Sequence, residues 1–402
     1  MRPTLVLLHR WFGLATALFL FVSGLTGAII SWDHELDEWL NPHLFHASSA
    51  GNALPVLELA DQLEATDPRL RVRFIPLQIE SGHSLGLMVE PRIDPLTQRP
   101  FDLGFNQVAL DPANGKVLGQ REWGKISLER ENLLPFLYKL HYSMHIPDID
   151  DLPLGTLFMG IIAIVWVFDS LFALWISFPN WSTWRQSFAF RWKSGGYRLT
   201  FDLHRSGGVW LFLLVLMLAV TSVSMNLKEQ VMRPLVGIFS ELSASPFADR
   251  VPAPVDRPIE PKIDRQTILS IARKEAEKRG LAAPPGGIFL STQFGVYAVG
   301  FFEADNNHGD GGLGNPWLFF DAHNGTALGG DIPGTGSAGD VFLQAMFPLH
   351  SGRIIGMPGR VLMSLMGLAI AMLSATGIII WARKRRARIS QKSRQREFAI
   401  SS

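Results

Sequence analysis

Four long apolar stretches constrain the fold of this chain more than any other feature. A helix that crosses a bilayer needs about 20 mostly apolar residues, and each stretch reaches that length. Two of them carry no Lys, Arg, Asp or Glu, one carries only Asp169 and one carries only Arg360. The stretches are residues 11–32, 152–178, 207–227 and 358–382. We therefore expect an α-helical membrane protein with four transmembrane helices.

Basic residues are concentrated in three short segments of the chain. Residues 1–10, 179–206 and 383–402 hold fifteen Lys and Arg but only two acidic residues. Because basic residues favour the cytoplasmic side of a membrane, we expect both termini in the cytoplasm. Segments 33–151 and 228–357 are then expected on the outer side, which is the periplasm in the bacterial inner membrane that the family resemblance given below implies. A cleaved signal peptide is the alternative for the N-terminus, and the long apolar run without an A-x-A site disfavours it.

The two halves of the chain resemble each other in sequence. A His-Arg pair precedes or opens the first and third apolar stretches, a D-x-x-N-G turn lies in each periplasmic segment, and a Leu-His pair precedes the second and fourth stretches. These features recur 195 to 210 residues apart, at His9 and His204, Asp111 and Asp321, and His141 and His350. Such a repeat predicts two parallel units related by an axis along the membrane normal.

Each unit is expected to contain a helix, a periplasmic α+β module and a second helix. In the modules, a helix at residues 55–65 or 265–279 precedes alternating strands, and the Asn-Gly of each turn is expected to supply the positive φ angles of a hairpin. The expected segments in chain order are 1–32, 33–151, 152–178, 179–206, 207–227, 228–357, 358–382 and 383–402.

The chain contains no cysteine. This excludes disulfides, iron–sulfur clusters, covalent c-type haem and cysteine zinc sites, so a metal must be bound by His, Met, carboxylate or backbone oxygen. His9 and His204 are expected near one membrane face, and His141 and His350 near the other. Two histidines that meet across a helix bundle can bind one haem iron. We therefore expect one haem at each face; interfacial histidines hydrogen-bonded to lipid headgroups or helix ends are the alternative.

Two further polar positions bear on these pairs. His145 follows His141 by four residues and shares its face on a helix, so either can be the partner of His350, and Met144 is a further alternative. Asp169 is an acidic residue within an apolar stretch, where a carboxylate must be paired, hydrogen-bonded or neutral. It is expected either to carry a proton with the electron or, as the favoured interpretation, to bond a neighbouring Ser or Trp.

The other histidines lie outside the apolar stretches. His34, His43 and His46 follow the first helix and form a candidate outer metal or substrate site, although a solvated segment is the favoured interpretation. The remaining histidines, which are expected to be ordinary surface residues, are His83, His308 and His323.

These motifs resemble those of the PepSY-associated transmembrane family. The matching sequences are the initial L-H-R-W-x-G, the two D-x-x-N-G-x-x-L-G turns, the two Leu-His pairs and H-S-G-R-I-I-G-M-P-G-R at residues 350–360. As a set they cover nearly the whole chain. Within the family, the chain is most similar to the di-haem inner-membrane siderophore reductases of ferrioxamine uptake.

The resemblance implies two b-type haems per chain. It implies that His9 and His204 hold the inner haem, and that His350 with His141 or His145 holds the outer one. It further implies that a ferric siderophore of the hydroxamate, ferrioxamine class is reduced in the periplasm to release Fe(II). An electron donor in the cytoplasm or the membrane is then required, because no G-x-G-x-x-G nucleotide motif follows a strand in the cytoplasmic parts.

Two other functions remain as alternatives. The PepSY name is linked to peptidase inhibition, so the periplasmic modules could bind a peptide or a protease in a regulatory role. A siderophore permease is the second alternative, although four helices leave little room for a substrate path within a monomer. The lipid bilayer is an expected partner. Nucleic acid is not, because the basic residues lie in short cytoplasmic parts rather than on a folded domain.

Overall fold

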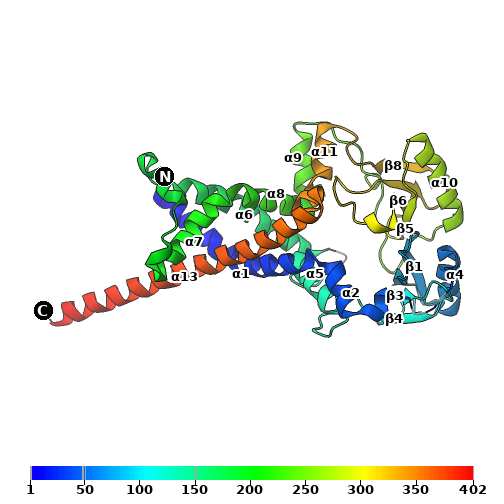
Figure 1. Ribbon diagram of the computed structural model, residues 1–402, viewed down its shortest axis with the longest axis horizontal. Helices are drawn as coiled ribbons and strands as arrows, with labels where there is room; N and C mark the ends of the chain where they lie inside the picture. The colour runs from blue at the N-terminus through cyan, green and yellow to red at the C-terminus, as the bar shows by residue number, and fades with distance from the viewer. Residues whose placement is uncertain (1, 48, 50, 150–151, 402) are drawn as a thin grey trace.

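The computed structural model describes all residues except 1, 48, 50, 150, 151 and 402. The molecule is elongated, with a helical bundle at one end and a β-sheet at the other (Figure 1). Both termini lie at the end of the bundle that is remote from the sheet. The expected module boundary at residue 151 lies outside the described residues.

Three helices are long and apolar enough to cross a membrane: α1 (Arg2–Ile30), α6 (Leu154–Ser177) and α13 (Met357–Ser401). A fourth candidate span is the pair α7 (Gly196–Trp210) and α8 (Phe212–Asn226), which is bent by 71°. By length and composition, the described part of the chain thus offers three spans, or four if the bent pair counts as one.

The third apolar stretch does not form the straight helix expected at 207–227. The helical axis breaks at Leu211, between α7 and α8. The break follows Ser206-Gly207-Gly208, and small residues of this kind are where helices bend sharply, because glycine is a weak helix former. His204 consequently lies on α7, at an angle to the apolar helix α8.

The bundle is held together by close helix approaches and an apolar core. Helices α1 and α13 meet where Gly24 faces Gly367, and a Cβ atom on Gly24 would lie only 2.6 Å from the Gly367 carbonyl oxygen. Small residues permit such contacts between membrane helices. Trp166 of α6, Leu218 of α8 and Met366 of α13 belong to the buried cluster at the bundle centre.

The sheet contains eight strands in the order β4-β3-β2-β1-β5-β6-β7-β8, and each neighbouring pair is antiparallel. The strands are β1 (Leu70–Pro76), β2 (Leu85–Pro91), β3 (Gln107–Leu110), β4 (Val117–Arg121), β5 (Pro285–Ser291), β6 (Val296–Phe301), β7 (Trp317–Asp321) and β8 (Ala327–Asp331). Each half of the chain thus contributes one four-stranded meander.

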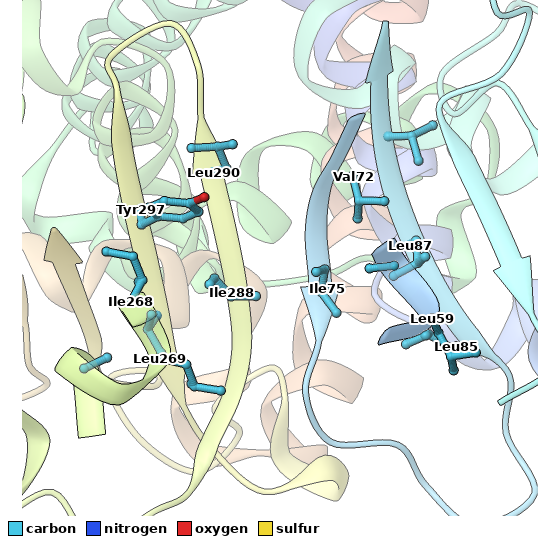
Figure 2. Packing of buried hydrophobic residues seen from close by; sticks show 14 of the residues in the cluster. Leu59, Val72, Ile75, Leu85, Leu87, Ile268, Leu269, Ile288, Leu290 and Tyr297 are labelled. Atoms are coloured by element: carbon cyan, nitrogen blue, oxygen red, sulfur yellow. The ribbon is translucent and has the colours of Figure 1, made fainter. Parts of the chain in front are cut away.

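The two outer modules share this one sheet. Strands β1 and β5 pair directly, with Phe74 opposite Phe289 and Ile75 opposite Ile288. Helices α4 (Val56–Thr66) and α10 (Arg265–Lys278) pack on the sheet, and side chains from both halves form a single hydrophobic core (Figure 2). Arg265 of α10 also binds Asp61 of α4 at 3.0 Å.

The two D-x-x-N-G segments form the expected hairpin turns, at β3–β4 and β7–β8. The backbone of the turns differs from the expected one in one respect. Only the glycines, Gly115 (φ +72°) and Gly325 (φ +74°), adopt positive φ, and the asparagines before them do not. The aspartates stabilise the turns instead: Asp111 Oδ1 accepts from Ala113 N at 3.0 Å, and Asp321 Oδ1 accepts from His323 N at 2.8 Å. A register shift follows in each hairpin.

Short helices connect the bundle and the sheet. Two of them, α5 and α12, carry the histidines of the Leu-His pairs. The short helices are α2 (Asp33–Leu40), α3 (Pro42–Phe45), α5 (Leu133–Ser143), α9 (Arg233–Gly237), α11 (Ala338–Gln344) and α12 (Met346–Ser351). The 3₁₀-helical segments are η1 (Trp181–Phe188), η2 (Trp192–Ser194), η4 (Ala304–Asn306) and η5 (Arg353–Ile355), and η3 (Lys228–Met232) is a π-helical turn.

Candidate functional site

The structure brings the four repeat-related histidines together as two pairs. His9 on α1 and His204 on α7 form the inner pair, near the termini, with ring centres 6.1 Å apart and ring planes at 38°. His141 on α5 and His350 on α12 form the outer pair, near the sheet, with ring centres also 6.1 Å apart and planes at 64°. Each pair takes one histidine from each half of the chain.

The two pairs lie near opposite ends of α1. His9 is the eighth residue of α1, and Gly27, which contacts the His141 ring, is 18 positions further along. At 1.5 Å per residue, this places the pairs about 27 Å apart along the helix axis. That separation is close to the hydrocarbon thickness of a bilayer, about 30 Å.

Hydrogen bonds fix the protonation of the inner pair. His9 Nδ1 donates to Asp169 Oδ1 at 2.8 Å, and His204 Nδ1 donates to the Leu373 carbonyl oxygen at 3.0 Å. A carboxylate and a carbonyl can only accept, so Nδ1 of each ring carries a hydrogen, and in the neutral imidazole Nε2 then keeps the free lone pair. The interpretation of Asp169 as a partner of a nearby Ser or Trp is therefore wrong, since its carboxylate binds a histidine on another helix.

The outer pair is fixed in the same way by neutral groups. His141 Nδ1 donates to the Ser23 carbonyl oxygen at 2.9 Å. His350 Nδ1 lies 3.0 Å from Thr221 Oγ1, and this hydroxyl donates its own hydrogen to the Met217 carbonyl oxygen at 2.9 Å. The hydroxyl must then accept from His350. Both outer histidines therefore also carry their proton on Nδ1 and leave Nε2 available.

The sequence analysis missed the threonines that support the outer pair. Thr26 Oγ1 lies 3.2 Å from His141 Nδ1, and Thr221 holds the equivalent place next to His350. Both hydroxyls also donate to the carbonyl four residues earlier. Thr26 and Thr221 are 195 positions apart, the same spacing as His9 and His204. That spacing is the signal that could have identified them.

Two glycines leave room for the histidine rings. A Cβ atom on Gly27 of α1 would lie 2.9 Å from His141 Cε1, and one on Gly377 of α13 would lie 3.0 Å from His204 Cε1. Both distances are shorter than an ordinary contact between two carbon atoms. A larger residue at either place would therefore displace the ring.

A cavity of about 980 Å³ opens between the helices at the inner pair. His9, His204 and Asp169 line it, and the rest of its wall is apolar with a group of basic residues. The main apolar side chains are Leu14, Leu20, Trp166, Phe212, Val215, Ile370 and Trp381. The basic residues are Arg2, Arg10, Arg205, Lys384, Arg385, Arg388 and Lys392. Such a wall suits a large apolar ligand that carries negative charge at one edge.

Two arginines in this wall have an unused donor. The Nε atoms of Arg10 and Arg205 are buried and have no hydrogen-bond partner among the described residues. Each arginine directly follows a histidine of the inner pair. Buried donors normally find an acceptor, so the two orphaned groups fit a ligand with carboxylates, such as the propionates of haem.

The ring separations also fit a shared metal. A bond between a metal and an imidazole nitrogen is about 2 Å, so two imidazoles on opposite sides of one metal have ring centres roughly 6 Å apart. Both pairs have this separation. The residues present therefore fit a haem iron at each pair, and the large cavity adds support at the inner one.

His145 does not share a face with His141. Helix α5 ends at Ser143, and both Met144 (φ +52°) and His145 (φ +53°) adopt positive φ beyond it. His145 Nε2 bonds the Phe136 carbonyl oxygen at 2.9 Å, and its ring stacks on Phe136. The structure thus places His141 beside His350 and turns His145 away.

A second cavity, of about 130 Å³, lies between the bundle and the sheet. His34 and His308 face each other in it, with ring centres 6.1 Å apart. Arg353, three residues after His350, lines the same cavity and binds Asp310 at 2.7 Å. The further residues of this outer pocket are Glu35, Glu80, Asp305, Asn306, Asn307 and Arg360.

His308 is thus part of a site rather than an isolated surface residue. Its pKa is lowered to about 4, because the surrounding protein disfavours the charged form and Arg353 adds a nearby positive charge. The residue is exposed and lines the pocket. His308 is therefore neutral at physiological pH.

The candidate site of His34, His43 and His46 is divided in the structure. His34 lines the outer pocket, His43 Nε2 lies 3.1 Å from Glu131, and His46 Nε2 lies 3.3 Å from Glu38. Each histidine has a different partner or pocket, so the three histidines do not form one site. His323 is exposed in the β7–β8 turn, as expected.

A family model matches the chain. The family model described as PepSY-associated TM region matches residues 6–384, which is nearly the whole chain. No curated protein matches the chain.

Proposed function

The chain belongs to the family of PepSY-associated transmembrane regions, and on that premise we propose that it is a membrane electron conduit with two b-type haems. One haem lies between His9 and His204, and the other between His141 and His350. Electrons enter from a donor on the side of the termini and leave to a ferric siderophore on the side of the sheet.

The observation that carries this proposal is the common design of the two histidine pairs. In each pair the ring centres are 6.1 Å apart, and each Nδ1 is held by an acceptor. Among the described residues, Nε2 of these four histidines has no hydrogen-bond partner. Each of these Nε2 atoms is therefore available as a ligand, and one metal at each pair would use both.

The chain supplies binding, orientation and exclusion of water. When bound, haem supplies a one-electron carrier at each pair. Asp169 and Leu373 orient the inner histidines, and Ser23 and Thr221 orient the outer ones. Hydrogen bonds of this type raise the basicity of a ligating histidine and fix its ring. The apolar wall of the inner cavity keeps water from the site.

The outer pocket supports an acceptor site next to the outer pair. Arg353 and Arg360 line the pocket, and Arg353 follows His350 by three residues. A cavity of about 130 Å³ is too small to enclose a ferric siderophore, so the chelate would rest on the surface with one edge inside. One electron from the donor converts Fe(III) to Fe(II), no covalent bond of the siderophore changes, and the ferrous ion is bound more weakly.

The proposed orientation places the sheet in the periplasm of a bacterial inner membrane. The positive residues at both termini and in segment 179–206 support it, and all three lie at the end of the bundle remote from the sheet (Figure 1). The electron donor is a separate cytoplasmic or membrane component.

A haem count of the purified protein tests the proposal. Protein from haem-replete cells should give a reduced b-type absorption spectrum and about two haems per chain by pyridine haemochrome. Addition of ferrioxamine to the reduced protein should re-oxidise it. A colourless protein would exclude the conduit and favour a peptide-binding role for the sheet.

Substitution of the inner histidines tests the assignment of the first site. His9→Ala and His204→Ala should each reduce the count from two haems to one, whereas His323→Ala, in an exposed turn, should leave two. If both inner variants keep two haems, the inner site is assigned to the wrong residues.

A further inference from the structure

Three potential metal ligands meet on the outer part of the molecule, away from the paired histidines. They are Glu38 on α2, His46 after α3, and His83 in the turn between β1 and β2. One ligand atom of each lies within 4.8 Å of the others. We refer to these residues as the outer triad.

Backbone pairing holds the two histidines of the triad together. His46 and His83 form an isolated antiparallel bridge. On either side of it, Ala47 N donates to the Gly82 carbonyl oxygen at 2.9 Å and Ser84 N donates to the Phe45 carbonyl oxygen at 2.8 Å. The imidazole ring centres are 5.3 Å apart. The two histidines are therefore held together by the backbone and not by the rotamer of a long exposed side chain.

The distances within the triad match the coordination shell of a small metal ion. His46 Nε2 and His83 Nε2 each lie 3.3 Å from the same oxygen, Glu38 Oε1. Ligand atoms that bind zinc tetrahedrally at 2.0–2.1 Å are about 3.3 Å from one another. The two histidine nitrogens lie within 4.8 Å of each other, and a water molecule would supply the fourth ligand of a tetrahedral shell.

The carboxylate of Glu80 lies behind the triad, in a position to orient the His83 ring. His83 Nδ1 is buried and has no hydrogen-bond partner among the described residues. Glu80 Oε2 is 4.0 Å away. A histidine that binds a metal through one nitrogen usually donates its other N–H to a carboxylate or carbonyl. A small movement of the Glu80 side chain would satisfy this donor.

We propose that Glu38, His46 and His83 bind one divalent transition-metal ion. Two imidazoles and one carboxylate suit Zn²⁺ or Fe²⁺, whereas Mg²⁺ and Ca²⁺ prefer oxygen ligands alone. The side chains are 27%, 49% and 25% exposed, in the order Glu38, His46 and His83, so an ion can reach them from solvent. Metal binding at this triad does not depend on whether the paired histidines hold haem.

Zinc titration of the full-length, detergent-purified protein with its haems bound tests this site. After treatment with a chelator, isothermal titration calorimetry with ZnCl₂ should show one saturable high-affinity site. His46→Ala and His83→Ala should each weaken it by at least about 100-fold, because they remove ligands, and Glu80→Gln by about 10-fold, the range seen for outer partners of ligands. The matched control is His43→Ala, which removes an exposed histidine of the same segment that is bonded to Glu131.

Two results would overturn the proposal. One is zinc affinity in His46→Ala and His83→Ala equal to that of the unmodified protein, which would place the bound zinc elsewhere. The other is the absence of a saturable site in the unmodified protein, which would leave Glu38 as an ion-pair partner of the two histidines. Glu38→Gln removes the carboxylate ligand but retains the shape of the side chain, so it should weaken zinc binding without disturbing the fold. The haem absorbance and thermal unfolding of each variant report whether it is folded.

Discussion

The inner and outer histidine pairs have the same separation but different surroundings. Both have ring centres 6.1 Å apart and Nδ1 bonded to an acceptor. The inner pair has a carboxylate, Asp169, behind one ring and borders the large cavity with its basic residues. At the outer pair both rings are supported by backbone carbonyl or threonine hydroxyl groups, whereas at the inner pair only His204 is supported in this way. A glycine packs against one ring of each pair.

The repeat thus preserves the separation of the two histidine rings, whereas the groups around each pair differ between the two halves of the chain. Asp169 has no acidic counterpart in the second half, where Ala375 aligns with it. The properties of a haem iron depend on hydrogen bonding to its ligands, nearby charge and exposure. Two sites with the same ligands but different second partners should therefore differ in redox potential.

The largest expected effect is the loss of the outer haem alone. His141→Ala or His350→Ala should reduce the pyridine haemochrome count from two to one, because each removes a ligand of the outer pair only. The remaining haem should have the same spectrum in both variants, because both retain the intact inner site.

His145→Ala is the control for this prediction. Its Nε2 is already bonded to the Phe136 carbonyl oxygen, so the variant should keep two haems. A loss of one haem in His145→Ala, with two retained in His141→Ala, would reverse the assignment of the outer ligand.

A smaller effect is expected when the glycines beside the rings are enlarged. Gly27→Ala should weaken the outer haem and Gly377→Ala the inner one, because each new methyl group would lie about 3 Å from a ring carbon. Overpacking of this kind costs about 1–3 kcal/mol, which corresponds to a several-fold or greater loss of haem affinity. Haem transfer to an acceptor protein measures it. Gly237→Ala in α9 is the control, since no atom would lie within 4 Å of the new methyl group; equal weakening of both sites by either variant would contradict the comparison.

The smallest expected effect is a shift in potential without loss of haem. Asp169→Asn should raise the midpoint potential of the inner site by about 50 mV, where 59 mV is a tenfold change for one electron, because a carboxylate favours the oxidised iron. Thr221→Val should shift the outer site less, since it removes a neutral group. Redox titration followed by absorbance separates the two. A shift of the outer site in Asp169→Asn would mean that the two environments are not independent.

The sequence indicated the parts of this arrangement that depend on the repeat. The spacings of 195 and 209 residues single out the histidines that the structure pairs, and the D-x-x-N-G segments form hairpins where they were expected. The same spacing would have indicated Thr26 and Thr221. Such features can be predicted from the sequence because they depend only on the spacing of residues along the chain.

Contacts between distant segments could not be predicted in this way. The pairing of β1 with β5 joins residues more than 200 positions apart, and nothing in either strand specifies that partner. His34 meets His308, and His46 meets His83, only because folding brings short helices and loops together. The bend at Leu211 depends on a glycine pair within a stretch whose hydropathy predicts an unbroken helix.

The junction between β1 and β5 has a consequence for the origin of the molecule. Each histidine pair takes one member from each half of the chain, and the sheet is continuous across the boundary between the halves. A half-length ancestor would have had an open sheet edge and only one member of each pair. It would have completed both pairs only as a symmetric homodimer joined along that edge, so gene duplication and fusion would have preserved an interface that already existed. After fusion, each half was free to diverge, and Asp169 could arise at one pair alone.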